Sequence, residues 1–229
     1  MIEIRGIGVS GSKGSGIVFK YERKPSQYHE VRDIDADVEK KRFTDILKTA
    51  KNEIEELYQK ALVIDQDSAE IFTSHEWLLD DCELIKYVEQ LLDYGYDLLS
   101  ALIRTKEDMK IHFLNMESEI FRSKVNDIDD VFDRLIKIES GTGEEHPFPK
   151  QPFILVCEDI LPSLVYRIPD ENLRGIITKY GSNCSHGVIL ARTKNIPVII
   201  RVKNRYDVIN NDDQIIMNGE SGAIFILDK

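Results

Sequence analysis

The sequence predicts an α/β domain that is interrupted by an inserted all-α helical bundle. Three observations favour this fold class: glycine-punctuated, strand-like sequence at the start, helical periodicity through the middle, and short apolar runs after a linker rich in proline and glycine. With 229 residues, the chain is long enough for one large domain or two small ones. Because the first segment is too short to bury a core, we expect it to join the sheet of the C-terminal part.

The helical part is predicted from about Asp33 to Ile138, where apolar residues recur at steps of three and four. Residues 1–22, in contrast, are typical of short strands joined by glycine-rich turns. The helical pattern predicts one long amphipathic helix through residues 43–62 and a second helix capped by Ser68. A third helix is expected after the acidic break Asp80-Asp81, and two more at about 97–120 and 125–138.

The linker is expected at residues 139–150, which are dense in glycine, proline and charge. Beyond it, short apolar runs predict strands at 153–157, 175–178, 197–200 and 214–217. The segment Asn218-Gly-Glu-Ser-Gly222 predicts a hairpin turn that leads into a last strand at 223–227. The expected domains are therefore residues 1–22 plus 145–229 for the α/β unit and residues 33–138 for the helical subdomain.

The charge of the chain argues against some classes of partner. Lys and Arg number 30 against 41 Asp and Glu, a net charge of −11, which disfavours nucleic acid and anionic membrane and favours a basic protein. The three cysteines Cys82, Cys157 and Cys184 have no metal-ligand spacing, so we expect no metal site and a reducing compartment. Since no apolar run approaches eighteen residues, we expect a cytoplasmic protein.

The strongest functional signal is His186, which stands where a glycine-bearing turn leads into a short helix. Residues 173–179 are typical of a buried strand, 181–185 of a turn, and 187–193 of a helix that Ser185 can cap. The first N–H groups of a helix lack intrahelical partners and carry the positive end of its dipole, so a phosphoryl group is stabilised there. His186 is the candidate catalytic residue, and Ser185, Cys184 and Arg192 are candidates for holding the phosphate or orienting the ring.

A family resemblance supports this assignment. The spacing Gly181-x-x-x-Ser185-His186-x-x-Ile189-x-Ala191-Arg192, followed by Asn195-Ile-Pro-Val198, resembles the swivelling phosphohistidine domain of phosphoenolpyruvate-utilising enzymes. The order of strand start, helical insertion, linker and phosphohistidine domain is similar to the N-terminal half of enzyme I of the bacterial phosphoenolpyruvate:sugar phosphotransferase system. The resemblance covers essentially the whole chain.

The resemblance implies a function and a partner. It implies that His186 exchanges phosphate, through Nε2, with the small phosphocarrier HPr docked on the helical lobe. The family's C-terminal phosphoenolpyruvate-binding barrel is not in this sequence, so we expect no reaction with phosphoenolpyruvate alone, no cofactor here, and Mg²⁺ only with that other domain. The segment from Ile71 to Leu84 resembles the family's docking segment, and the expected partner-binding residues are His75, Trp77, Leu78, Leu79, Asp81 and Lys124.

Two departures and several alternatives stay open. Cys184 stands where the family usually has threonine, and the threonine thought to hydrogen-bond the active histidine aligns near Val165, so Ser163 is an alternative partner for the ring. Arg192 can tie its helix to the domain instead of binding phosphate, and the leucines of the docking segment can be bundle core. Alternative functions are an HPr-binding regulatory module that has lost transfer, and the swivelling domain of a pyruvate phosphate dikinase-like enzyme.

Overall fold

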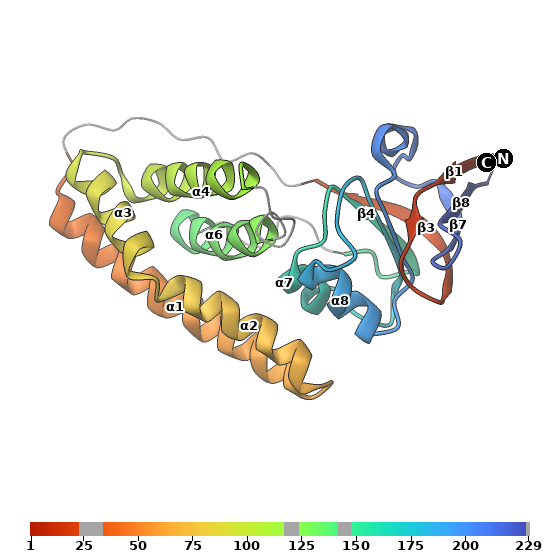
Figure 1. The fold of residues 1–229 in the computed structure, drawn as a ribbon, viewed down its shortest axis with the longest axis horizontal. Helices are drawn as coiled ribbons and strands as arrows, with labels where there is room; N and C mark the ends of the chain where they lie inside the picture. The colour runs from red at the N-terminus through yellow and green to blue at the C-terminus, as the bar shows by residue number, and fades with distance from the viewer. Residues whose placement is uncertain (23–33, 117–123, 142–147, 228–229) are drawn as a thin grey trace. The chain divides into compact units, whose positions relative to one another are not determined.

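The chain divides into two compact units in the computed structural model, which describes residues 1–22, 34–116, 124–141 and 148–227 (Figure 1). One unit comprises Met1–Arg23 and His146–Lys229, and the other comprises Lys24–Glu145. The sequence-based boundaries were placed at residues 22 and 145. Of the expected linker, Glu139 and Ser140 belong to the last helix of the helical unit, and residues 142–147 lie outside the described residues.

The first unit is built on one eight-stranded mixed sheet, which confirms the α/β fold class. Its strands, in the spatial order β1-β8-β7-β3-β4-β5-β6-β2, are parallel from β3 to β6 and antiparallel elsewhere. The N-terminal strands join this sheet, as expected, because β3 pairs with β4 and β7. The strand bounds are β1 Ile2–Arg5, β2 Ile7–Gly8, β3 Lys13–Tyr21, β4 Phe153–Cys157, β5 Leu173–Thr178, β6 Val198–Ile200, β7 Gln214–Asn218 and β8 Ala223–Ile226.

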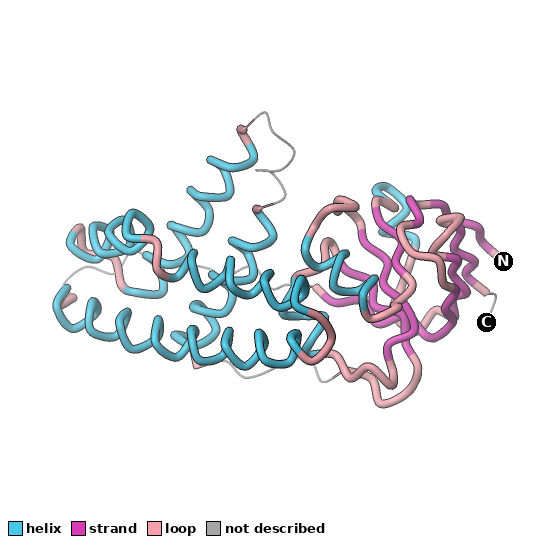
Figure 2. The backbone as a smooth tube through the Cα atoms, turned by 60° about the horizontal axis from the view of Figure 1, so that its bottom comes forward, coloured by secondary structure: helices cyan, strands magenta, loops and turns pink. Residues whose placement is uncertain are grey.

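Both faces of the central strands are covered. Every residue of β4 is buried, and alternate residues such as Ile154 and Val156 belong to an apolar cluster with residues of β5 to β8. Helices α7 (Pro162–Arg167) and α8 (His186–Thr193) pack against each other, and α8 also contacts β6 (Figure 1). The 3₁₀ helix η1 (Lys203–Val208) contributes Tyr206 to the cluster. The tube in Figure 2 displays these helices beside the strands.

The second unit is all-α in its described residues (Figure 2). Its helices are α1 Ala36–Leu62, α2 Gln66–Leu79, α3 Cys82–Asp93, α4 Leu98–Leu114 and α6 Val125–Ser140. Among the described residues, none of the helices has both the length and the apolar character that a membrane span requires. Helix α4 ends at Leu114 instead of near residue 120, and residues 117–123 lie outside the described residues.

Aspartates, not serine, cap helices α1 to α4 of this unit. The side chains of Asp35, Asp65, Asp81 and Asp97 accept hydrogen bonds from the first amides of α1 to α4. The predicted cap Ser68 is instead the third residue of α2, and Asp65 Oδ1 accepts from its N–H at 2.7 Å. A carboxylate at this position also interacts favourably with the helix dipole, which is why aspartate serves here.

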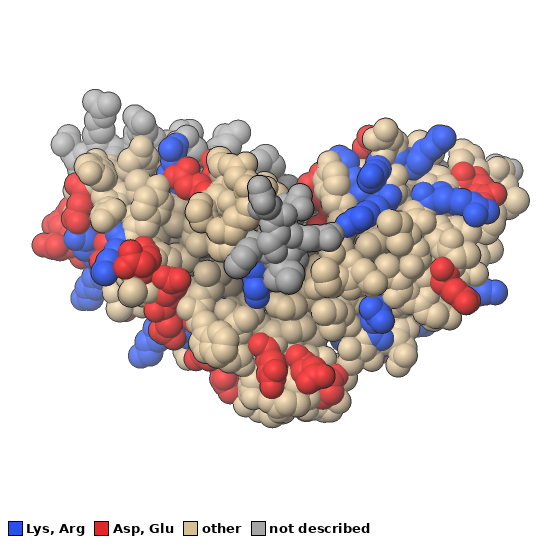
Figure 3. Space-filling model, in the orientation of Figure 1, with Lys and Arg blue, Asp and Glu red and all other residues tan. Residues whose placement is uncertain are grey.

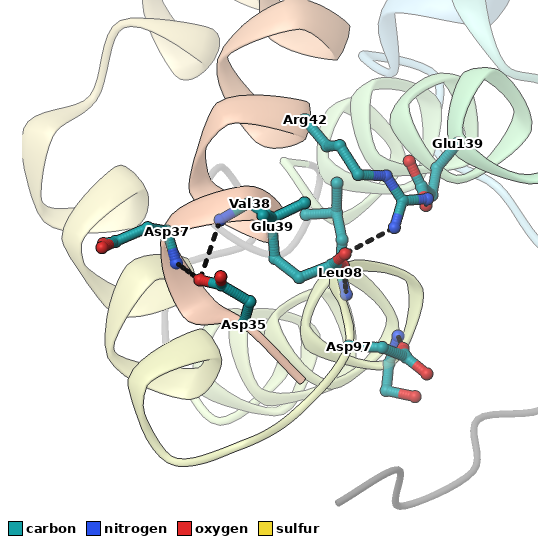
Figure 4. A network of polar contacts seen from close by, with 9 residues as sticks. Asp35, Asp37, Val38, Glu39, Arg42, Asp97, Leu98 and Glu139 are labelled. Atoms are coloured by element: carbon teal, nitrogen blue, oxygen red, sulfur yellow. Dashed lines mark hydrogen bonds and ion pairs between the residues drawn. The ribbon is translucent and has the colours of Figure 1, made fainter. Parts of the chain in front are cut away.

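A network of two buried carboxylates and one arginine joins three helices of this unit (Figure 4). Glu39 of α1 accepts a hydrogen bond from the N–H of Leu98, at the start of α4, at 2.8 Å, and its other oxygen lies 2.5 Å from Nη1 of Arg42. Arg42 also pairs with Glu139 of α6. Burial raises the pKa of Glu139, although the positive charge of Arg42 opposes the shift. Arg42 therefore neutralises two carboxylates that the fold removes from water.

Replacement of Arg42 by alanine is expected to lower the free energy of unfolding by about 1–2 kcal/mol, because it leaves Glu39 and Glu139 together without their cation. The loss is smaller than for a fully buried pair because the Arg42 side chain is half exposed. Urea denaturation measures it. The control is Lys86→Ala, which removes an exposed partner of Glu83 and should leave the midpoint unchanged. Equal effects of the two substitutions would contradict this interpretation of the network.

Candidate phosphohistidine site

His186 is the first residue of α8, directly after the turn that follows β5. Gly181 begins this turn with a φ of +108°, a backbone region that glycine adopts without steric penalty. Ser185 has the extended backbone of an N-cap residue, and its carbonyl accepts the first intrahelical hydrogen bond, from the N–H of Ile189 at 3.0 Å. His186 is partly exposed, so the residue lies at the surface of this unit and not in its core.

The hydroxyl of Ser185 does not cap the helix, which corrects the expected role of this side chain. Ser185 Oγ donates to the carbonyl of Ser182 at 3.1 Å, and the Ser185 N–H donates to the same oxygen at 3.2 Å. Ser185 is buried and has no side-chain hydrogen bond to the amides of α8. The Ser185 hydroxyl therefore does not compete with an anion for the N–H groups of the first turn, as the hydroxyl of an ordinary serine cap would.

A close backbone approach fixes the orientation of the first turn of α8. A Cβ atom added to Gly187 would lie 2.2 Å from the carbonyl oxygen of Ile160, so a larger residue does not fit without movement of the backbone. Ile160 follows the end of β4, and its N–H donates to Oδ1 of Asp159 at 2.8 Å. The helix that carries His186 thus rests directly on the loop at the carboxyl end of a central strand.

The other predicted phosphate or orienting residues lie on the same turn and helix. Cys184 is exposed, and its Sγ lies 3.0 Å from Oγ of Ser182. Arg192 is also exposed and reaches back from the last turn of α8, where Nη1 donates to Oδ1 of Asn183 at 3.2 Å. This contact favours a tie between helix and turn for Arg192, and it also keeps the guanidinium on the side of the turn that leads to His186.

The two residues considered for orienting the imidazole lie in α7. Val165 is buried and apolar. Its backbone carbonyl accepts a hydrogen bond from Nζ of Lys194 at 3.4 Å. Its side chain offers no hydrogen bond to a ring. Ser163 is buried at the start of the same helix. Ring orientation by a threonine hydroxyl at position 165 is therefore excluded in this chain.

Sequence reasoning missed a segment that supports the histidine turn from outside, residues 201–203, which follow β6. The N–H groups of Arg201, Val202 and Lys203 donate to the carbonyls of Tyr180, Thr178 and Lys179, respectively, each at 3.1 Å. The signal that could have revealed this segment is its position: the basic residue Arg201 comes directly after β6, at the carboxyl end of a parallel strand, where α/β sheets place their ligands. Among the described residues, no group of three His, Cys, Asp or Glu side chains is arranged to hold a metal ion.

The predicted docking residues separate into surface and core. The Trp77 side chain is 71% exposed on α2, and Leu78 is partly exposed. His75 and Leu79 are each 1% exposed, so the structure places these two predicted docking residues in the bundle core and not on its surface. His75 instead lies edge-on to Phe72, and its Nε2 is 3.4 Å from Oδ1 of Asp127. Because a helix turns by about half a circle in two residues, His75 and Leu79 lie on the face of α2 opposite Trp77, which is the buried face.

The two remaining candidates have contacts within the helical unit. Asp81 is exposed, and its Oδ1 accepts from the N–H groups of Glu83 and Leu84 at 2.9 and 3.2 Å as the cap of α3. Lys124 precedes α6, and its Nζ lies 3.3 Å from Oδ2 of Asp127. Both side chains can still meet a partner from the surface, but their loss would also weaken the bundle.

The family comparisons agree with this geometry. Residues 149–222 match the family described as PEP-utilising enzyme, mobile domain, and residues 5–124 match PEP-utilising enzyme, N-terminal. The chain therefore belongs to the family of phosphoenolpyruvate-utilising enzymes. Within that family it corresponds to the N-terminal half of enzyme I, the phosphoenolpyruvate-protein phosphotransferase.

Individual relatives define how far the similarity extends. The phosphoenolpyruvate-protein phosphotransferases of Bacillus subtilis and Listeria innocua are 28% and 26% identical over 99% and 98% of this chain. The chain spans 40% of the length of each. Two solved structures share the fold. An NMR solution structure of Enzyme I has a TM-score of 0.70 and 24% identity, with coverage of 99% of this chain and 93% of that chain. The N-terminal domain of Enzyme 1 - Nitrogen has a TM-score of 0.64 and 20% identity, with coverage of 97% of this chain and 93% of that chain.

Replacement of Gly187 by alanine is expected to lower the free energy of unfolding by about 2–3 kcal/mol, because the methyl group meets a backbone carbonyl that cannot rotate away. Chemical denaturation measures this loss. Gly11 is the matched control, since a Cβ there meets nothing within 4 Å, and Gly11→Ala should change stability by less than about 0.5 kcal/mol. If Gly187→Ala were as stable as Gly11→Ala, the close approach of α8 to Ile160 would be wrong.

Proposed function

We propose that this chain is a phosphoryl carrier of the sugar phosphotransferase system, in which His186 accepts phosphate from the phosphocarrier HPr and returns it. The observation that carries the proposal is the start of α8. A partly exposed imidazole is the first residue of a helix whose N-terminal amides receive no side-chain cap. Such amides stabilise the charge that develops on a phosphoryl group during transfer. The family membership of both units supports the same reading.

The reaction is a reversible in-line displacement at phosphorus. The unprotonated ring nitrogen of His186, Nε2 by family resemblance, forms the new N–P bond, while the bond from phosphorus to the donor breaks and its electron pair stays on the donor. Most of the acceleration in phosphoryl transfer comes from positioning and charge stabilisation. The amides of α8 supply the stabilisation, and the turn from Gly181 to Ser185 supplies the positioning.

Charge separation between the two units supports docking of a basic protein on the helical unit. Residues 24–145 contain 30 Asp and Glu against 16 Lys and Arg, whereas the α/β unit contains 11 against 14. Asp and Glu are prominent on the visible face of the helical unit, and Lys and Arg gather on that of the α/β unit (Figure 3). An acidic surface with exposed Trp77 offers a charged rim and an aromatic anchor, a combination that interfaces favour.

The proposal includes a cytoplasmic location, and it assigns the reaction with phosphoenolpyruvate to a separate phosphoenolpyruvate-binding domain. No resident cofactor or metal is assigned to the chain. A second candidate, a module that binds HPr without transferring phosphate, is favoured by one observation: the buried Val165 stands where a hydroxyl would orient the ring.

Incubation of the chain with phosphorylated HPr is expected to label it with a phosphate that is labile in acid and stable in base, because the new bond joins phosphorus to nitrogen. His186→Ala should abolish the label, as measured by intact-protein mass spectrometry. His112 is exposed on α4, away from α8 in the chain, and His112→Ala should be labelled as fully as the unsubstituted protein. An unlabelled chain that still bound HPr would favour the second candidate.

Replacement of Trp77 by alanine is expected to weaken HPr binding by roughly tenfold to thirtyfold, since an exposed aromatic anchor at an interface is worth about 1.5–2 kcal/mol. Isothermal titration calorimetry measures the Kd. Tyr94 is an exposed aromatic residue at the end of α3 and serves as the matched control. If Tyr94→Ala weakened binding as much as Trp77→Ala, the assignment of the docking surface to α2 would be wrong.

A further inference from the structure

The backbone of the segment after β6 is hydrogen-bonded to the residues that lead into the turn before His186. Residues 201–203 donate three hydrogen bonds to the carbonyls of residues 178–180, and this pairing lies beyond the last ladder pair between β5 and β6, Ile177 with Ile199. Thr178 Oγ1 adds a bond to the carbonyl of Tyr180 at 2.5 Å. The strand β5 is thus extended by an irregular pairing that ends one residue before Gly181.

One side chain continues this contact into the turn itself. Nε of Arg201 donates to the carbonyl oxygen of Gly181 at 2.7 Å, and this bond is charge-assisted because guanidinium is always protonated. Gly181 has a φ of +108°, and a Cβ there would lie 3.2 Å from Oδ1 of Asp159 and 3.3 Å from Oγ1 of Thr178. Arg201 therefore holds the first peptide of a turn in which glycine alone fits without strain.

The backbone conformation of residues 201 and 203 allows the side chain of Arg201 to be removed without strain on the fold. Arg201 and Lys203 both have left-handed backbones, with φ of 60° and 48°. Glycine adopts this region more readily than arginine or lysine, so glycine at either position relieves strain while it removes the side chain. Lys203 is exposed and carries the same charge, and its backbone N–H donates to the carbonyl of Lys179 at 3.1 Å.

We propose that Arg201 is a positioning residue for phosphoryl transfer at His186, acting through the carbonyl of Gly181. By fixing the peptide after Gly181, it fixes the direction in which the turn from Ser182 to Ser185 enters α8, and hence the approach of the imidazole to phosphorus. Misplacement of a reacting group by about 1 Å can slow such a reaction roughly a hundredfold. The inference rests on the proposed function for its effect on rate, and on the structure alone for its effect on the turn.

The experiment compares Arg201→Gly with Lys203→Gly in the full 229-residue chain. Both variants lose one positive charge and relieve one left-handed residue, so both are expected to melt close to the unsubstituted protein. Arg201→Gly should exchange phosphate with HPr about tenfold more slowly, with the change in kcat instead of KM. Lys203→Gly should stay within about twofold of the unsubstituted rate. Arg201→Lys, which keeps a cationic donor, should recover part of the loss.

Amide hydrogen exchange supplies a readout that does not need phosphate. The amides of Ser182 to Ser185 should exchange faster in Arg201→Gly and should be unchanged in Lys203→Gly. Equal transfer rates in the two glycine variants would overturn the inference. If the unsubstituted chain took no phosphate at all, the proposed function would fail, and the positioning role would be judged on the exchange of these amides alone: equal protection in both variants would overturn it.

Discussion

The absence of a side-chain cap on α8 is the feature on which the proposed chemistry depends. Ser185 has the backbone of a cap residue, but its hydroxyl bonds to the carbonyl of Ser182, within the preceding turn. A hydroxyl that accepted from the helix amides would compete with a phosphoryl group for the same donors. The fold thus uses a residue typical of caps to brace the turn, so its hydroxyl does not compete at the positive end of the helix, where the proposed function places a phosphoryl group on His186. The backbone contact between Gly187 and Ile160 then holds that helix end against the carboxyl end of β4.

The two units differ in the sign of their charge. The helical unit holds most of the acidic residues, and it uses some of them internally: aspartates cap four helices, and Glu39 and Glu139 share Arg42. The remaining acidic surface is suited to a basic protein partner. The α/β unit instead places basic residues such as Arg201 beside the histidine turn. Under the proposed function, an acidic docking surface and a phosphate-binding turn would be incompatible on one small surface, because the acidic residues would repel the phosphate. An inserted subdomain resolves this conflict.

The sequence predicted what local patterns encode and failed where tertiary contacts decide. The α/β fold with an inserted bundle followed from periodicity, and the position of His186 at the start of a helix followed from the strand, turn and helix pattern. The role of Ser185 could not be predicted, since a cap and a turn brace have the same sequence. His75 and Leu79 resembled docking residues but lie in the bundle core, because periodicity alone does not say which face of a short helix is outside. Arg201 was missed because its contact with Gly181 joins residues twenty positions apart.

The most direct test of the central claim is an NMR comparison of the amide groups at the start of α8 before and after the chain is phosphorylated by phospho-HPr. If the phosphoryl group on His186 is held by the uncapped end of the helix, the amide protons of Gly187 and Val188 should move downfield and exchange more slowly with solvent, because they gain a charge-assisted acceptor. Phosphorylation at His186 that leaves these amides unchanged, or phosphate bound to another residue, would contradict the claim that the helix terminus supplies the site.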